Sequence, residues 1–184
     1  MNDIVRVGGK LALICAVAAV ALGLVNAVTA PAIEKVKERQ LAMALDAVRG
    51  TAQVGEERIV EDVPIVEGYY PLTENGASSG YILKLTGMGY AGDMEILASY
   101  ALDGEIKAVA LTNNSETPGL GKEAEKPEYM EKYTGSGAER SVPMNKQQLT
   151  QEQADSISGA SITFMGIAQA LKAGSDYVKE QLGK

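Results

Sequence analysis

Histidine is absent from this chain of 184 residues, and cysteine occurs once, as Cys15. The protein therefore cannot supply the ligands of an iron–sulfur cluster, a thiolate zinc site or a Cys-x-x-Cys-His haem site, and it has no His to act as a general base. Because Cys15 stands alone in an apolar run, it provides no disulfide framework and does not identify the redox compartment. These absences narrow the possible chemistry more than most positive signals do.

Basic residues are also in deficit. The chain has 17 Lys and Arg residues against 24 Asp and Glu residues, a formal net charge of -7. A sequence-independent nucleic-acid binder needs a basic face that replaces phosphate counterions, so we expect no nucleic-acid partner. The length leaves room for one modest globular domain beyond a membrane anchor, and a two-domain enzyme is not expected.

An apolar run covers residues 11–30, with Asn26 and Thr29 as its clearly polar side chains. Its length matches the roughly 20 residues that a helix needs to cross the hydrocarbon of a bilayer. We predict a transmembrane helix over 11–30, preceded by an N-terminal tail over 1–10. A cleaved signal peptide is the alternative, but the run is long for its apolar region and Pro31 would follow the cut. A lipoprotein is disfavoured, because no small residue of the required kind precedes Cys15.

Charge does not orient this anchor. Basic residues flank both sides of the run, and their count mildly opposes an N-terminus in the cytoplasm. The residues concerned are Arg6 and Lys10 on one side, and Lys35, Lys37 and Arg39 on the other.

The rest of the chain predicts an α+β fold. Apolar residues recur at helical spacing between Ala32 and Arg49, so we expect a connecting helix over 31–50 that stops at Gly50. Within 60–70 the pattern is β-branched and aromatic, with Pro64 limiting any strand to a sheet edge. Residues 81–86 predict a strand with one buried and one wetter face, because Ile82, Lys84 and Thr86 alternate with Tyr81, Leu83 and Leu85.

The clearest strand signal is a hairpin of residues 94–102 and 105–111 around Asp103-Gly104, a pair suited to a type I′ turn. The C-terminal segment predicts an amphipathic helix that covers one side of an antiparallel sheet. Its expected buried stripe is Met165, Ala168, Leu171, Val178 and Leu182.

Three short motifs carry the candidate chemistry. The segment from Asp155 to Thr163 places hydroxyls and a Gly-Ala pair before that helix, where unpaired backbone N–H groups attract an anion such as phosphate. An ordinary N-cap is the alternative for these residues. The loop Glu116–Lys122 combines Pro118 with two glycines, which permit close approach to a ligand or simply form a turn. The third motif is Gly89-Tyr90-Ala91-Gly92.

Together the motifs resemble those of extracytoplasmic FMN-binding domains. The 155–163 segment resembles their Asp-x-x-Ser-Gly-Ala-Ser/Thr-x-Thr/Ser motif, at which a flavin transferase joins FMN to a hydroxyl through a phosphoester. The other two resemble the family's Glu-Thr-Pro-Gly-Leu-Gly and Gly-Tyr-x-Gly signatures. With the membrane segment, the resemblance covers nearly the whole chain and is strongest for the G subunit of Rnf-type ion-translocating ferredoxin:NAD oxidoreductases. The C subunit of sodium-translocating NADH:quinone reductases shares the motifs but is usually longer.

The resemblance implies a role for each motif residue. Ser161 takes the acceptor position, where relatives more often have Thr, and Thr163 is a rival acceptor. Asp155 would be read by the transferase. The remaining residues that the resemblance places around FMN are Ser158, Gly159, Ala160, Glu116, Thr117, Pro118, Gly119, Leu120, Gly121 and Tyr90. For Tyr90, a core position is an equal alternative.

No residue set predicts catalysis on a separate organic substrate. The carboxylates between Glu123 and Glu131 alternate with Lys122, Lys126 and Lys132, as on a solvated helical face. The resemblance therefore implies a non-catalytic electron carrier with covalent FMN, whose domain over 51–184 lies outside the cytoplasm and meets other subunits of a membrane complex. The alternatives are another extracytoplasmic flavin domain and a flavin-free assembly module in which Ser161 is merely an N-cap.

Overall fold

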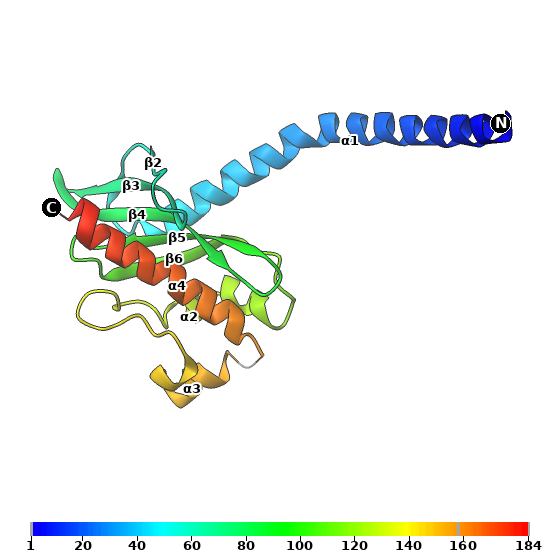
Figure 1. Ribbon diagram of the computed structural model, residues 1–184. Coiled ribbons are helices and arrows are strands. Elements are labelled where there is room, and N and C mark those ends of the chain that lie inside the picture. Colours follow the sequence, from blue (N-terminus) through cyan, green and yellow to red (C-terminus); the bar gives the residue numbers. More distant parts are fainter. Residues whose placement is uncertain (1, 158, 184) are drawn as a thin grey trace. The chain divides into compact units, whose positions relative to one another are not determined.

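A computed structural model describes residues 2–157 and 159–183 (Figure 1). The chain divides into two compact units, Met1–Leu41 and Ala42–Lys184. The first is helical, and the second contains an antiparallel sheet with helices.

Helix α1 spans Asn2–Val48 without interruption. In the part of the chain that the structure describes, it is the single helix long and apolar enough to cross a membrane, judged by length and composition. The helix includes the residues before position 11 and continues through Pro31, so the predicted span and connecting helix are one element. The Thr29 hydroxyl donates to Val25 O at 2.9 Å, which satisfies this polar group inside the apolar run.

The last turns of α1 belong to the second unit. Val48 is buried, and Ala44 and Leu45 are half-buried, which is the i, i+3, i+4 spacing of one helical face. The helix ends at Val48, and Gly50 follows with a φ of 58°, a left-handed conformation that glycine adopts without strain. The predicted stop at Gly50 is confirmed.

In the described residues, six strands form one antiparallel sheet in the order β1-β3-β4-β5-β6, with β2 also pairing with β3. From β3 onward, consecutive strands are neighbours, as in a meander. The strands are β1 (Gln53–Val54), β2 (Arg58–Ile59), β3 (Val66–Glu74), β4 (Ala77–Met88), β5 (Asp93–Tyr100) and β6 (Ile106–Asn113).

The expectation that Pro64 confines a strand to the edge is wrong. Pro64 precedes β3, and β3 is an interior strand that pairs with β4 on one side and with β1 and β2 on the other. Pro71 lies within β3, opposite the interruption between the two-residue strands β1 and β2. Because proline offers no N–H, pairing along this side of β3 is broken into short pieces.

The hairpin of β5 and β6 is confirmed, but its predicted type I′ turn is wrong. Gly104 has a φ of 83° while Asp103 does not have a positive φ, and the connection is longer than two residues. Ala101 N–H donates to Glu105 O (2.8 Å) and Gly104 N–H to Ala101 O (3.0 Å), as in a type I turn followed by a left-handed glycine. The type I′ pattern occurs instead at Asn75-Gly76, with φ values of 52° and 80° between β3 and β4.

Both faces of the sheet bury side chains. Leu83 and Leu85 join the main core beneath α4. Ile82 is fully buried on the opposite face, next to its cross-strand neighbours Tyr70 and Ser99. The predicted two-sidedness of β4 therefore holds only for Lys84 and Thr86, which are half-exposed.

Helix α4 (Ser161–Tyr177) lies against β4 and β5 and continues into a π-helical turn, Val178–Leu182 (Figure 1). Two buried tyrosines donate to its backbone: Tyr133 to Phe164 O (2.9 Å) and Tyr100 to Leu171 O (3.0 Å). The predicted stripe is correct except at Met165, which is 43% exposed. The buried residues begin with Thr163 and Phe164 instead, because a one-residue step turns a side chain by about 100° around the helix.

Between β6 and α4 the chain forms short elements, and they position the functional motifs. These are the 3-10 helix η1 (Gly121–Glu125), α2 (Pro127–Met130), the 3-10 helix η2 (Lys146–Gln148) and α3 (Gln151–Asp155).

Candidate functional site

The three sequence motifs meet around one cleft of about 430 Å³. One wall comes from the β4–β5 connection, the second from the loop after β6, and the third from the start of α4. The lining residues are Tyr90, Glu116, Thr117, Leu120, Gly121, Gly159, Ala160, Ser161, Ile162 and Thr163. All but Ile162 are residues that the sequence singled out. Ile162 was missed although it stands within the 155–163 motif.

Glu116 joins the three walls. Its side chain is buried, and its Oε1 accepts hydrogen bonds from Tyr90 N–H (2.7 Å) and Ala91 N–H (3.2 Å). Its Oε2 accepts from the Thr163 hydroxyl at 3.0 Å. A buried carboxylate is costly unless such donors compensate it. Glu116 therefore lines the cleft and connects all three motifs through its hydrogen bonds.

Glycines make room for this carboxylate. A Cβ on Gly89 or on Gly121 would collide with the Glu116 side chain. Gly159 has a φ of 84°, and a Cβ there would come within 2.7 Å of Leu120 Cδ2. These three positions need glycine because of close approach, and at Gly159 also because of backbone conformation.

The loop after β6 is held by its own backbone. Thr117 O accepts from the N–H groups of Leu120 (3.2 Å) and Lys122 (3.3 Å), while Gly119 has a φ of 76°. Pro118 and Gly119 are exposed and do not line the cleft. The structure therefore places these two predicted contact residues in the turn that presents Thr117 and Leu120.

Helix α4 begins at the cleft without a side-chain cap from the described residues. Ala160 occupies the N-cap position, and Ser161 is the first helical residue, so the N-cap interpretation of Ser161 is wrong. Phe164 N–H donates to Ala160 O (3.0 Å), whereas no described side chain accepts from the N–H groups of residues 161–163. Such unpaired donors attract an anion.

The two candidate acceptor hydroxyls differ in accessibility. Ser161 is exposed at the cleft, while Thr163 is 1% exposed and its hydroxyl is engaged by Glu116. Ser158 lies outside the described residues. This difference in burial could not be read from the sequence, which offers two similar hydroxyls two positions apart.

Asp155 does not start a helix, contrary to that interpretation of its position. It ends α3, and its Oδ1 accepts from Gln151 Nε2 at 2.9 Å. It is exposed and does not line the cleft.

The cleft suits a ligand with a phosphate and a flat apolar part. Exposed hydrophobic surface surrounds the helix start: Tyr90 is 74%, Ile162 50% and Leu120 43% exposed. Among the described residues, Glu116 is the only charged side chain in the lining. Behind the cleft, burial and secondarily the Glu116 charge raise the pKa of Tyr129, so its hydroxyl stays neutral.

Two protein families match the chain. The FMN-binding domain family matches residues 89–176, which include every residue that lines the cleft, and the RnfG N-terminal region matches residues 1–48. The chain therefore has a long apolar helix followed, later in the sequence, by an FMN-binding domain.

Relatives align along nearly the whole chain. This chain is 28% identical over 190 residues to the G subunit of the ion-translocating oxidoreductase complex of Methanosarcina acetivorans. The alignment covers 99% of this chain and 98% of the relative. The chain is 28% identical over 186 residues to the G subunit of the Na(+)-translocating ferredoxin:NAD(+) oxidoreductase complex of Acetobacterium woodii (90% and 87% covered). For the G subunit of the proton-translocating ferredoxin:NAD(+) oxidoreductase complex of Clostridium ljungdahlii, the identity is 21% over 177 residues (96% and 92% covered). The chain thus combines a match to the RnfG N-terminal region with a match to the FMN-binding domain, and its relatives along nearly the full length are G subunits of ion-translocating oxidoreductase complexes. Its helix α1 is long and apolar enough to cross a membrane.

Proposed function

We propose that this chain is the electron-carrying G subunit of a membrane ferredoxin:NAD oxidoreductase, and that it holds FMN covalently through a phosphoester on Ser161. The observation that carries the proposal is the exposed hydroxyl of Ser161, inside the cleft, at a helix start that no described side chain caps. When bound, FMN supplies the redox chemistry, which the side chains of this protein do not offer.

The helix start serves the attachment. In the transfer step, Ser161 Oγ would form a bond to the FMN-side phosphorus of a flavin dinucleotide. The bond from that phosphorus to the bridging oxygen would break, a nucleoside monophosphate would leave, and the serine proton would pass to water. The N–H groups of residues 161–163, for which the described residues offer no side-chain acceptor, would stabilise the phosphate charge. Gly159 keeps the approach to the backbone open. A flavin transferase performs this step, and Asp155, exposed and outside the cleft, is available for its recognition.

The exposed apolar residues around the start of α4 would contact the flavin ring. Tyr90, Leu120 and Ile162 offer one aromatic and two aliphatic surfaces to a flat apolar ligand. Thr117 adds a hydroxyl in the lining. These side chains orient the ring and shield part of it from water.

The location follows from the same proposal. We place the domain after α1 outside the cytoplasm, in contact with other subunits of the complex. A flavin held reversibly there would be lost by diffusion, whereas a phosphoester does not dissociate during turnover. The C subunit of a quinone reductase is the weaker alternative, because the full-length relatives described above are G subunits. Two of these relatives differ in coupling ion, Na(+) in one and protons in the other, so the ion is not assigned.

Mass spectrometry tests the attachment. Co-expression with an active flavin transferase should raise the intact mass of the denatured chain by one FMN, and digestion should locate the addition on Ser161. An unmodified mass under conditions in which a control substrate is flavinylated would refute covalent attachment. Modification of Thr163 would refute the acceptor assignment alone.

A further inference from the structure

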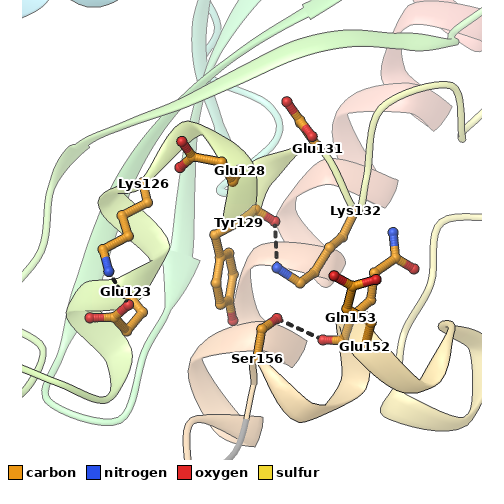
Figure 2. Close-up of a pocket in the computed structure, with 9 residues that line it drawn as sticks. All are labelled: Glu123, Lys126, Glu128, Tyr129, Glu131, Lys132, Glu152, Gln153 and Ser156. Atoms are coloured by element: carbon orange, nitrogen blue, oxygen red, sulfur yellow. Dashed lines mark hydrogen bonds and ion pairs between the residues drawn. The ribbon is translucent and has the colours of Figure 1, made fainter.

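Lys132 is a buried cation without an ion pair among the described residues. It was expected on a solvated helical face, yet it is 6% exposed. Its Nζ donates to Tyr129 O (3.3 Å) and lies 4.2 Å from the centre of the Tyr129 ring, as Figure 2 shows. Within the part of the chain that the structure describes, no carboxylate oxygen lies within 4.0 Å of it. Burying an ammonium group is costly unless an anion compensates it, so the position calls for one.

A separate cleft of about 210 Å³ opens beside this lysine. Four chain segments contribute to it: the turn after α2, the loop before η2, the end of η2 with the residue that follows, and α3. No acidic side chain of residues 2–157 or 159–183 lines it. The lining residues are Lys132, Arg140, Ser141, Pro143, Gln148, Leu149 and Gln153.

The two glutamines present their NH₂ groups as free donors. Gln148 Oε1 accepts from the N–H groups of Met144 (2.6 Å) and Asn145 (3.2 Å), and Gln153 Oε1 accepts from Thr150 N–H (3.2 Å). A backbone N–H donates to the oxygen of a side-chain amide and not to its NH₂ group. These hydrogen bonds therefore determine the positions of Oε1 and Nε2 in both glutamines. Within the described residues, neither NH₂ group has an acceptor.

Arginine and serine complete the donor set. Arg140 donates from Nη2 to Thr134 O (2.6 Å), which holds the guanidinium while its other N–H groups remain available. The residues that line the cleft therefore carry an ammonium, a guanidinium, a hydroxyl and two amide NH₂ groups.

The acidic residues lie in the neighbouring cleft. That cleft, of about 280 Å³, shares Lys132 and Gln153 and is drawn in Figure 2. Glu128, Glu131 and Glu152 line it but do not line the smaller one. Burial lowers the pKa of Lys132 despite the opposing charge of Glu131, so these carboxylates do not replace a direct partner.

We infer that the cleft at Lys132 binds a small tetrahedral oxyanion, for which inorganic phosphate is the test ligand. Five donors around one volume match an anion with acceptors in three dimensions. The volume is below the roughly 300–1,000 Å³ of drug-sized ligands, so a nucleotide is too large. The described lining residues of this site and of the flavin cleft do not overlap. A bound anion would link α2, η2 and α3, the segments that lead to Ser161.

Calorimetric titration of the full-length protein in detergent tests the site. Phosphate is added at constant ionic strength, with chloride as the balancing ion. We expect saturable binding with one site per chain, and at least tenfold weaker binding in Lys132→Met, which keeps the length of the side chain but loses its charge. Lys107→Gln is the matched control, because Lys107 is an exposed lysine paired with Glu105, and it should bind phosphate like the parent.

Three results would overturn the inference. They are the absence of saturable phosphate binding, unchanged affinity in Lys132→Met, and equal affinity for acetate. If Lys132→Met does not fold, Arg140→Gln at an exposed position provides the second test, with at least threefold weaker binding expected. Unchanged affinity in that variant counts equally against the site.

Discussion

At the scale of single residues, the two hydroxyls at the start of α4 differ in accessibility, and we expect substitutions at Ser161 and Thr163 to have different effects. Ser161→Ala should abolish covalent flavin, because the exposed acceptor oxygen is removed. Ser161→Thr should remain a good substrate. In-gel flavin fluorescence after denaturation measures each variant. Strong fluorescence of Ser161→Ala would show that the acceptor lies elsewhere.

Thr163→Ala should keep most of the flavin but lose stability. Its hydroxyl donates to the buried Glu116 carboxylate, and a hydrogen bond to a charged group contributes about 1.5–3 kcal/mol. Thr163→Ser is the matched control, because it retains the hydroxyl. Urea denaturation of the two variants should show that difference in free energy of unfolding. Equal stabilities would mean that the contact contributes nothing.

Glu116 lines the cleft, but we expect its substitution to lower the free energy of unfolding as well. Glu116→Ala leaves two backbone N–H groups and the Thr163 hydroxyl without their acceptor, at a cost of at least about 2 kcal/mol. Glu116→Gln keeps an oxygen for the N–H groups and should be milder. The free energies of unfolding of both variants, measured without flavin, separate this role from cofactor binding. A larger loss in the Gln variant would contradict it.

At the scale of elements, the turn between β3 and β4 depends on backbone conformation. Gly76 has a φ of 80° and open space around its Cβ position. Gly76→Val should cost about 1–2 kcal/mol, because a β-branched residue resists left-handed φ, whereas Gly76→Asn should cost less. Comparing the melting temperatures of Gly76→Val and Gly76→Asn measures the cost of the left-handed backbone conformation. Equal melting temperatures would argue against the type I′ turn.

The boundary between anchor and domain lies inside α1. A chain that begins at Ala42 should be soluble and still flavinylated, since it keeps the buried Val48 and the whole sheet. A chain that begins at Gly50 loses Val48 and should be less stable by about 1.5–3 kcal/mol. Fractionation and denaturant titration test both chains. A chain from Ala42 that stays with the membrane would show a second membrane contact.

At the scale of the whole molecule, buried tyrosines set an alkaline limit on stability. Burial, as the largest cause, raises the pKa of Tyr70, Tyr100, Tyr129 and Tyr133. Above the unfolded pKa of about 10, the unfolded chain loses these protons while the folded chain keeps them. The stabilising effect is therefore complete below pH 10 and falls as pH rises beyond it.

We expect the flavin-free protein to unfold at lower urea concentration at pH 11 than at pH 9. The tyrosinate absorbance of the four buried tyrosines should appear together with unfolding and not before it. Tyrosinate absorbance from all tyrosines in the folded state would contradict the protected, neutral core.

The local sequence determined a large part of this protein. Continuous apolarity determined the long helix, helical spacing determined most of the buried face of α4, and three glycine-containing motifs identified residues that line one cleft. These signals are local, because propensity, periodicity and short motifs act within a few turns of the chain. The same locality explains the errors. Which turn is type I′, which proline limits the sheet and whether Ile82 is buried depend on strand pairing and on the layers on both faces.

Only the tertiary structure decided what the residues at the cleft do. Thr163 and Ser161 are chemically alike in sequence. They differ in the structure because Thr163 is buried and donates to Glu116, 47 residues away, while Ser161 is exposed. Lys132 looks like one of several solvated lysines until folding brings it under the loop before η2 and beside α3. Burial and hydrogen-bond partners are set by segments that are distant along the chain, so no local pattern can encode them.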